Sequence, residues 1–262
     1  MLRAYRAAWL FLRRPLLLWP TLGAILVFSV MTIAITFFSA SQPGGSRLTD
    51  PRLTLESLSD PTSPAVMVAR PIMIIGILAL AVAAIHMATM FSSGSIRVQL
   101  VRMPDRRRWL AGTWLALTVF TVGMTIAAGI AALATTWIAA AAYDVDTSQW
   151  TTPQAIGATA VSLANLCLGM IAYALAGSVL AVWLRSAAPA LGVAIVYALF
   201  ETALNAAAPV GDGILPASAF ATVASSGTNG PDYLRALVAT IVVLAVILTA
   251  VTALFRNRDV TD

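Results

Sequence analysis

Long, uninterrupted apolar runs restrict the fold of this chain more than any other feature. A helix needs roughly 20 apolar residues to cross the hydrocarbon core of a bilayer, and several runs reach that length. Only 10% of the residues are charged, against about 25% in soluble domains. The sequence therefore predicts an all-α, polytopic membrane protein with a single transmembrane domain over residues 1–262.

Six transmembrane helices are predicted from these runs. They cover residues 16–38, 71–91, 109–139, 155–183, 189–205 and 234–255. The polar, Pro-rich stretch from Ser39 to Arg70 is expected to be a loop with a short helix around 53–58. The segment ILPASAFATVA, residues 214–224, is too short to cross, and we expect a short helix that dips into the outer leaflet.

The first 15 residues predict an amphipathic helix that lies at the membrane interface. At about 100° per residue, Arg3, Arg6, Arg13 and Arg14 fall on one arc, and Tyr5, Ala8 and Leu12 fall on the opposite side. Such a segment is too short and too charged to span, but it suits contact with membrane lipid.

Arginine placement predicts the orientation. With both termini in the cytoplasm, 12 arginines lie on that side and 4 lie outside, as the positive-inside rule requires. The tryptophans predicted at the inner membrane boundary are Trp19, Trp109, Trp114 and Trp183. The Ala- and Arg-rich composition suggests a GC-rich bacterium, so we expect a multi-pass protein of a bacterial cell membrane.

The composition excludes several kinds of chemistry. All 16 basic residues are Arg, and a phosphate-binding P-loop needs a Lys. There is one Cys and one His, so the usual Cys-based zinc sites are excluded and no metal site is expected. We expect no catalytic residues, hence no enzyme, and no nucleic-acid binding, because the arginines lie in short loops between apolar runs.

The connection between the second and third predicted spans, Ser92 to Arg108, is the most informative segment. Gly94 is suited to end one helix, and Pro104-Asp105 to begin another. Between them, SIRVQLVR predicts a short helix along the membrane surface. Two interpretations remain open: a handle for a partner that pushes on the spans, or a basic loop that only obeys the positive-inside rule.

The run FSSGSIRVQLVRMPDRRRWLAGTWLA resembles the second-to-third-span connection in permease subunits of type-2 ABC exporters. The matching positions are Phe91, Gly94, Ser95, Ile96, Arg97, Leu100 and Arg106–Arg108. The ending FRNRDV (Phe255–Val260) and the overall layout of the chain are also similar to that family. The sequence departs from the family pattern at Met90, where an acidic residue is usual, and at Thr113, where a Lys is common.

The resemblance implies a membrane subunit without its own motor. It implies a second permease chain, identical or related, and separate ABC ATPase subunits that carry ATP and Mg, so that this chain binds no cofactor. The implied ATPase-coupling residues are Gly94, Ser95, Ile96, Arg97, Leu100, Arg102, Asp105, Arg106, Arg107 and Arg108, together with the N-terminal helix. The alternatives are a stand-alone secondary transporter or channel, or a membrane scaffold subunit.

Polar residues within predicted spans are costly in lipid and are therefore candidates for a translocation path. Tyr197, Glu201 and Asn205 are spaced to share one helical face. Either they line a path, or the span ends earlier and Glu201 reaches water. His86 is a further path candidate, although a neutral His bonded to a neighbouring helix is the simpler interpretation.

The fourth predicted span carries small and polar residues that suggest helix contacts. Gly169 and Gly177 offer small faces for close approach. Asn165 and Tyr173 are interpreted mainly as residues that help this span contact its neighbours.

Overall fold

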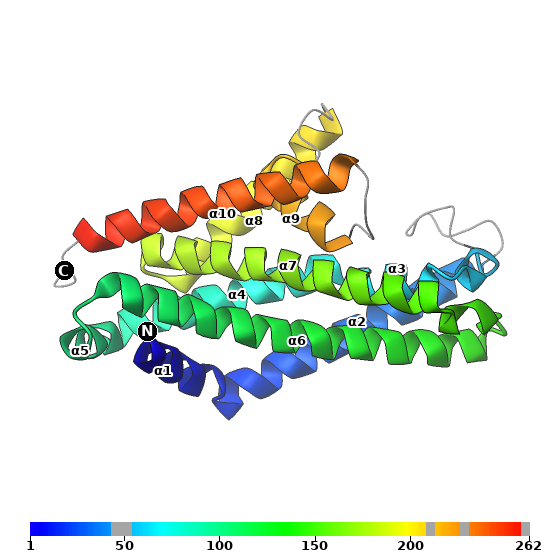
Figure 1. Ribbon diagram of the computed structural model, residues 1–262, viewed down its shortest axis with the longest axis horizontal. Coiled ribbons are helices and arrows are strands. Elements are labelled where there is room, and N and C mark those ends of the chain that lie inside the picture. Colours follow the sequence, from blue (N-terminus) through cyan, green and yellow to red (C-terminus); the bar gives the residue numbers. More distant parts are fainter. Residues whose placement is uncertain (43–53, 208–212, 226–230, 258–262) are drawn as a thin grey trace.

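The computed structural model describes residues 1–42, 54–207, 213–225 and 231–257, except for the side chains of residues 202, 205–207, 231, 256 and 257. Every regular element within these ranges is a helix, which confirms the all-α prediction (Figure 1). The α-helices are α1 Leu2–Leu12, α2 Pro15–Ala40, α3 Ser63–Ala69, α4 Ile72–Ser92, α5 Ser95–Arg102, α6 Arg106–Ala142, α7 Pro153–Leu184, α8 Ala187–Ala207, α9 Pro216–Ser225 and α10 Pro231–Asn257. Two short 3₁₀ helices are η1 Ser57–Ser59 and η2 Ser148–Thr151.

Five helical segments of the described chain are long and apolar enough to cross a membrane, so the protein is membrane-embedded. They are α2, the α3–α4 segment Ser63–Ser92, α6, α7, and Asp232–Phe255 of α10. The predicted span 189–205 forms a helix as expected, α8, but its described apolar part, Ala187–Glu201, is shorter than the other five. A sixth span therefore stays a prediction.

Local sequence explains where the long helices begin and end. The Asp105 side chain accepts hydrogen bonds from two backbone N–H groups at the start of α6, and Thr152 caps α7 in the same way. Gly94 adopts a left-handed φ of 65°, which separates α4 from α5. Arg185, also left-handed with φ 54°, forms the tight turn between α7 and α8.

The prediction of a loop from Ser39 to Arg70 is wrong for its last part. Residues 63–69 form α3, most of whose side chains are buried. Its carbonyl at Ala65 accepts a 2.7 Å hydrogen bond from the Ser162 hydroxyl of α7. Pro71 lacks a backbone N–H and therefore interrupts the helix between α3 and α4. The helix expected around 53–58 appears as the shorter η1.

The long helices run along a common axis and leave two distinct ends (Figure 1). The start of α1, the whole of α5 and the last turns of α10 lie at one end, here called the α5 end. At the opposite end, Trp150 of η2 is buried and donates a 3.1 Å hydrogen bond to the carbonyl of Leu58 in η1. Buried Phe37 of α2 belongs to the same apolar cluster.

Helix α7 lies against most of the other helices, and its glycines permit this. Gly177 lies directly against the backbone of Leu80 in α4, and Gly169 lies against the Phe220 carbonyl of α9. A side chain at either position would collide with main-chain atoms of the neighbouring helix. The prediction of close helix contacts at these two glycines is confirmed.

Candidate functional site

Helix α5 forms where the sequence predicts it, and two contacts fix it to the bundle. Ile96 is buried among α4 and α6 side chains. The indole Nε1 of Trp109, at the start of α6, donates a 2.7 Å hydrogen bond to Oε1 of Gln99. Leu100 is half-buried and contacts the same apolar cluster. The side of α5 that faces the protein is therefore tied to the first turn of α6.

An aromatic cluster beneath α5 joins three long helices. Trp109 of α6 is fully buried and stacks on Phe255 of α10 with ring centroids 5.7 Å apart. Phe91 of α4 meets the same ring edge-on at 6.4 Å. Arg106 adds a 3.0 Å hydrogen bond from Nη1 to the Phe255 carbonyl. Such aromatic pairs contribute about 0.5–1.5 kcal/mol each beyond the area they bury.

The sequence pattern did not point to the burial of Trp109 or to its hydrogen bond with Gln99. Trp109 was predicted near the inner membrane boundary; its side chain is fully buried, and its depth in a membrane stays a prediction. Gln99 carried no signal of its own. Its position three residues after Ile96, on the same face of a short helix, is the feature that indicates a contact with the bundle.

The opposite side of α5 is exposed and mixes charge with apolar surface. Arg97, Val98, Val101 and Arg102 are adjacent on this side, and we call them the α5 face. Val98 is 61% exposed and Val101 is 84% exposed. Exposed β-branched side chains between arginines, on a helix held rigidly from behind, form a surface suited to a protein contact.

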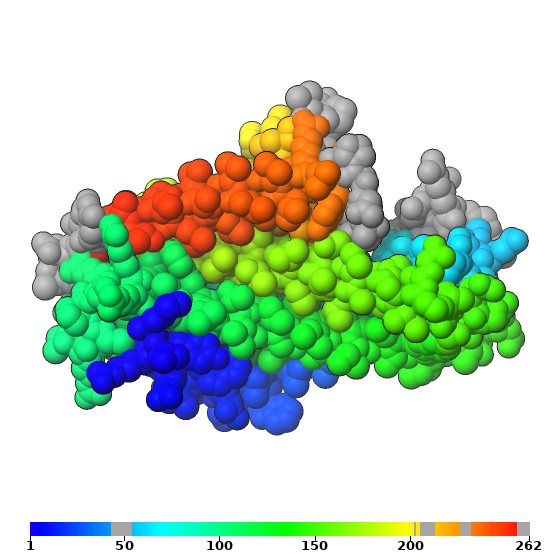
Figure 2. All heavy atoms as spheres, viewed as in Figure 1, coloured from blue at the N-terminus to red at the C-terminus, as the bar shows by residue number. Residues whose placement is uncertain are grey.

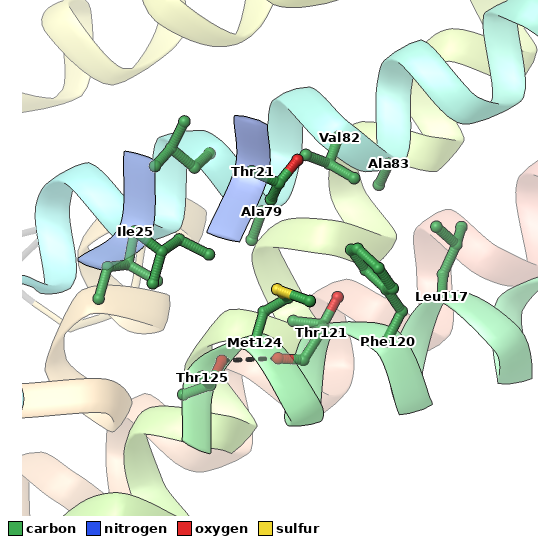
Figure 3. Close-up of a pocket in the computed structure, with 12 residues that line it drawn as sticks. Thr21, Ile25, Ala79, Val82, Ala83, Leu117, Phe120, Thr121, Met124 and Thr125 are labelled. Atoms are coloured by element: carbon green, nitrogen blue, oxygen red, sulfur yellow. Dashed lines mark hydrogen bonds between the residues drawn. The ribbon is translucent and has the colours of Figure 1, made fainter. Parts of the chain in front are cut away.

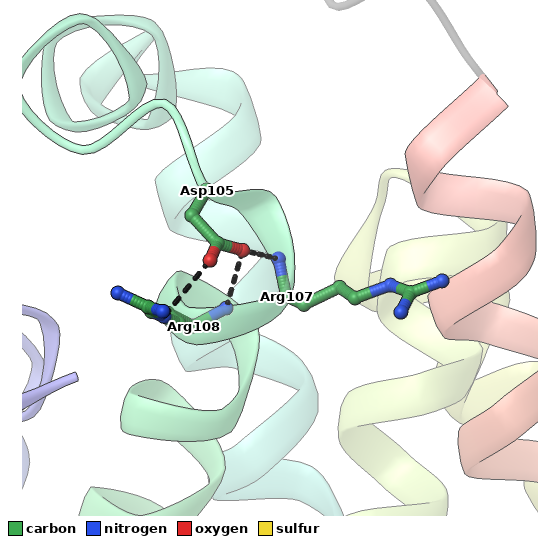
Figure 4. A network of polar contacts seen from close by, with 3 residues as sticks. All are labelled: Asp105, Arg107 and Arg108. Carbon is green, nitrogen blue, oxygen red and sulfur yellow. Dashed lines mark hydrogen bonds and ion pairs between the residues drawn. The ribbon is translucent and has the colours of Figure 1, made fainter.

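Asp105 organises the arginines that follow it rather than facing a partner (Figure 4). One carboxylate oxygen accepts 3.1 Å hydrogen bonds from the backbone N–H groups of Arg107 and Arg108, and the other lies 3.0 Å from Nε of Arg108. The side chain of Arg107 points away from this network. The exposed ion pair contributes little stability, so the main role of Asp105 is to begin α6.

Helix α1 packs on the bundle with one face and exposes its arginines on the other. Ala4, Ala8 and Leu12 are buried, mainly against α6. The contact is closest at Gly112, where a Cβ atom would lie 2.6 Å from the Met1 carbonyl oxygen. The arginines predicted on the opposite arc, Arg3, Arg6, Arg13 and Arg14, are all exposed.

Glu201 is buried, so the alternative that it reaches water is wrong. It is 2% exposed, and its carboxylate accepts hydrogen bonds from the backbone N–H groups of Ala217, at 3.0 Å, and Ser218. Tyr197, on the same face of α8, hydrogen bonds to Glu201. The Asn205 side chain lies outside the described residues. Glu201 therefore caps α9, where a negative charge complements the positive end of the helix dipole.

Two tyrosine hydroxyls attach α9 and α10 to α7. The Tyr173 hydroxyl donates a 3.1 Å hydrogen bond to the Ala217 carbonyl, and the Tyr233 hydroxyl of α10 donates a 2.7 Å hydrogen bond to Oδ1 of Asn165. Helix α9 thus occupies a space between α7, α8 and α10 and buries Phe220 there. The short helix expected at 214–224 is confirmed, whereas its depth in a leaflet stays a prediction.

His86 lies apart from the α9 region. It is fully buried in α4 and meets the Phe11 ring of α1 edge-on, with centroids 4.9 Å apart. Neither ring nitrogen has a hydrogen-bond partner among the described residues, so the expected bond to a neighbouring helix is not found. The structure does not bring His86 together with Glu201 in one site.

A small cavity of about 20 Å³ lies between α2, α4 and α6 (Figure 3). Two of its three threonine hydroxyls are bonded within their own helices: Thr21 donates to the Leu17 carbonyl at 2.7 Å, and Thr125 donates to the Thr121 carbonyl at 2.8 Å. Apart from the threonines, the lining is apolar and includes Phe120 and Met124. None of the predicted path residues lines this cavity.

Comparison with known protein families identifies a match over most of the chain. The model of a family described as "Protein of unknown function (DUF2705)" matches residues 62–261, more than half of the chain. The chain belongs to the DUF2705 family. No curated protein and no solved structure matches it.

The DUF2705 match begins just before α3 and includes α5 and α9. It leaves out α1 and α2, so the exposed arginines of α1 lie outside the part of the chain that the family model matches. The description of DUF2705 names no activity.

Proposed function

We propose that this protein is a permease subunit of an ABC exporter in a bacterial cell membrane, and that it forms half of a translocation path. The observation that carries the proposal is the placement of α5. This short helix connects two long helices, packs on the bundle through Ile96 and Gln99, and exposes its opposite side. The α5 face is the site where a separate ATPase subunit docks. This assignment agrees with the resemblance of residues 91–108 to the coupling segment of such permeases.

The contacts around α5 make it a suitable point for transmitting movement. A displacement of α5 acts through Ile96 on the core and through Gln99 on Trp109 of α6. From Trp109 it reaches Phe255 and therefore α10. Close-packed interiors transmit strain instead of absorbing it, so a push at one exposed helix moves three long helices together.

The other parts of the proposal follow from this assignment. ATP and Mg bind to the partner, because a chain without Lys cannot form a P-loop. This chain then has no enzymatic role, and it pairs with a second permease chain, identical or related. Helix α8 is the sixth span, both termini are cytoplasmic, and α1 lies at the cytoplasmic membrane interface.

A site-specific crosslinking experiment tests the docking of an ATPase. In a Cys167→Ser background, the Val101→Cys variant is labelled with a photoreactive maleimide in native membranes, and crosslinked products are identified by mass spectrometry. The matched control is Ile138→Cys, which is also exposed but lies near the opposite end of α6. We expect a P-loop ATPase to be crosslinked at position 101 and not at 138.

Two outcomes would contradict the proposal. One is the absence of an ATPase from the products at position 101 while labelling is complete. The other is substrate transport by the purified chain alone in liposomes, which would favour a stand-alone secondary transporter or channel.

A further inference from the structure

The turn between α1 and α2 carries arginines beside large exposed apolar side chains. Arg6, Arg13 and Arg14 are exposed here, and so are Leu10 (69%), Leu16 (89%) and Trp19 (66%). We call these six residues the elbow face. Figure 2 shows α1, in dark blue, on the outside of the bundle, with α2 continuing from it.

The buried side of α1 fixes the direction in which the elbow face points. Ala4, Ala8 and Leu12 are almost fully buried, and the α1 backbone touches Gly112 of α6. Rotation of α1 would expose these three side chains and lose the close contact at Gly112. The arginines and leucines of the elbow face are therefore turned away from the protein in the described structure, and something other than this bundle must cover them.

Charge and position together identify the partner. The first acidic residue of the sequence is Asp50, so no carboxylate on α1 or α2 offsets the three arginines. The Arg14 guanidinium lies over the Phe11 ring at 4.6 Å, which holds it at the turn. Guanidinium groups match phosphate geometrically, and α2, which begins at Pro15, is long and apolar enough to enter a bilayer.

We infer that the elbow face binds the headgroup phosphate of an anionic phospholipid, with the acyl chains against Leu16 and Trp19. A lipid supplies both the phosphate for the arginines and the apolar surface for the adjacent side chains. A protein partner fits less well, because Leu16 and Trp19 already belong to a membrane-spanning helix. The inference rests on the proposed interfacial position of α1, but not on ATPase coupling.

Lipid titration of the purified full-length chain tests this inference. The protein in neutral detergent is titrated with the anionic lipid phosphatidylglycerol or with zwitterionic phosphatidylcholine, and bound lipid is counted by native mass spectrometry. The test variant carries Arg6→Gln, Arg13→Gln and Arg14→Gln. The control carries Arg102→Gln, Arg107→Gln and Arg108→Gln, which removes the same charge at the α5 end.

We expect the test variant to lose on the order of 100-fold in phosphatidylglycerol affinity, since each arginine near a lipid surface contributes about 1 kcal/mol. The control should change by less than about threefold. For the unchanged protein, raising the ionic strength from about 0.01 M to about 1 M should weaken binding strongly, because the Debye length falls from about 30 Å to about 3 Å. Because this salt test uses the unchanged protein, it does not depend on whether the arginine variant folds.

Three results would overturn the inference. They are equal binding of both lipids, equal losses in the two variants, or full competition by inorganic phosphate, which would indicate a site for a free anion. A fourth result, from a separate experiment, would also overturn it: crosslinking of an ATPase to a Leu10→Cys variant would assign the elbow face to a protein instead. None of these results affects the crosslink at position 101, so failure here and failure of the proposed function are distinguishable.

Discussion

The indole N–H of Trp109 is buried and has the side-chain oxygen of Gln99 as its partner, at 2.7 Å. This bond joins a half-exposed residue of α5 to a fully buried residue of α6. The two partners therefore differ in whether their polar group can reach water once the other side chain is removed. Gln99 can turn to solvent, whereas the Trp109 N–H cannot.

The first prediction uses this asymmetry. Gln99→Leu should cost about 1–3 kcal/mol, because it leaves a buried donor without a partner. Trp109→Phe also loses that bond but leaves no buried donor, so its cost comes from the lost ring contacts. The rate of hydrogen exchange at the α5 amides should rise in both variants. Thermal unfolding should measure how much stability each variant loses. A negligible effect of Gln99→Leu would mean that the bond does not hold α5.

The second prediction concerns the cap of α9. Glu201→Leu removes both acceptors from the Ala217 and Ser218 amides, and hydrogen bonds to charged groups contribute about 1.5–3 kcal/mol. We expect faster hydrogen exchange at these two amides and lower thermal stability. Glu201→Gln keeps one carbonyl oxygen and should lie between the Leu variant and the unchanged protein. Glu56→Gln, at an exposed acidic position of the described chain, is the control and should change nothing.

The third prediction compares glycines. Gly177→Ala places a methyl group against the Leu80 main chain and should destabilise the protein by about 1–3 kcal/mol. Gly123→Ala, in α6, meets nothing within 4 Å and should be stabilising by about 0.5–1 kcal/mol, because Ala is the better helix former. The two melting temperatures should therefore move in opposite directions. A shift in the same direction would contradict the close contact of α4 and α7.

The fourth prediction concerns His86. Its two ring nitrogens have no hydrogen-bond partner among the described residues, so His86→Leu removes buried polar groups at little packing cost. We expect unchanged or higher thermal stability and unchanged transport in a reconstituted complex. A loss of transport with intact folding would return His86 to the translocation path.

Much of the fold was predictable because the signals for it are local. Apolar runs locate the long helices, Gly94 marks the start of α5, and Asp105 marks the start of α6. In α3, by contrast, a seven-residue apolar stretch is flanked by polar residues, and its burial depends on Ser162 in a distant helix.

The functional residues were less predictable because their partners are remote. Glu201 caps a helix that begins 15 residues later, and no periodicity connects the two. Trp109 follows a run of arginines, which suggests an interface position, but Phe255 and Gln99 together bury it. The exposed arginines of α1 were predicted correctly, because helical spacing alone decides which side they occupy.

Helix α6 has 37 residues, so it is about 55 Å long, well beyond the roughly 30 Å of a hydrocarbon core. Part of α6 must therefore lie outside the hydrocarbon core, and we expect that part to include the end of the bundle that contains the Trp150–Leu58 bond. One continuous hairpin of α6 and α7 must then be stable in two solvents at once. A denaturant confined to water should loosen the Trp150 end while the lipid-embedded segment stays helical, so this protein should unfold in stages along its own length.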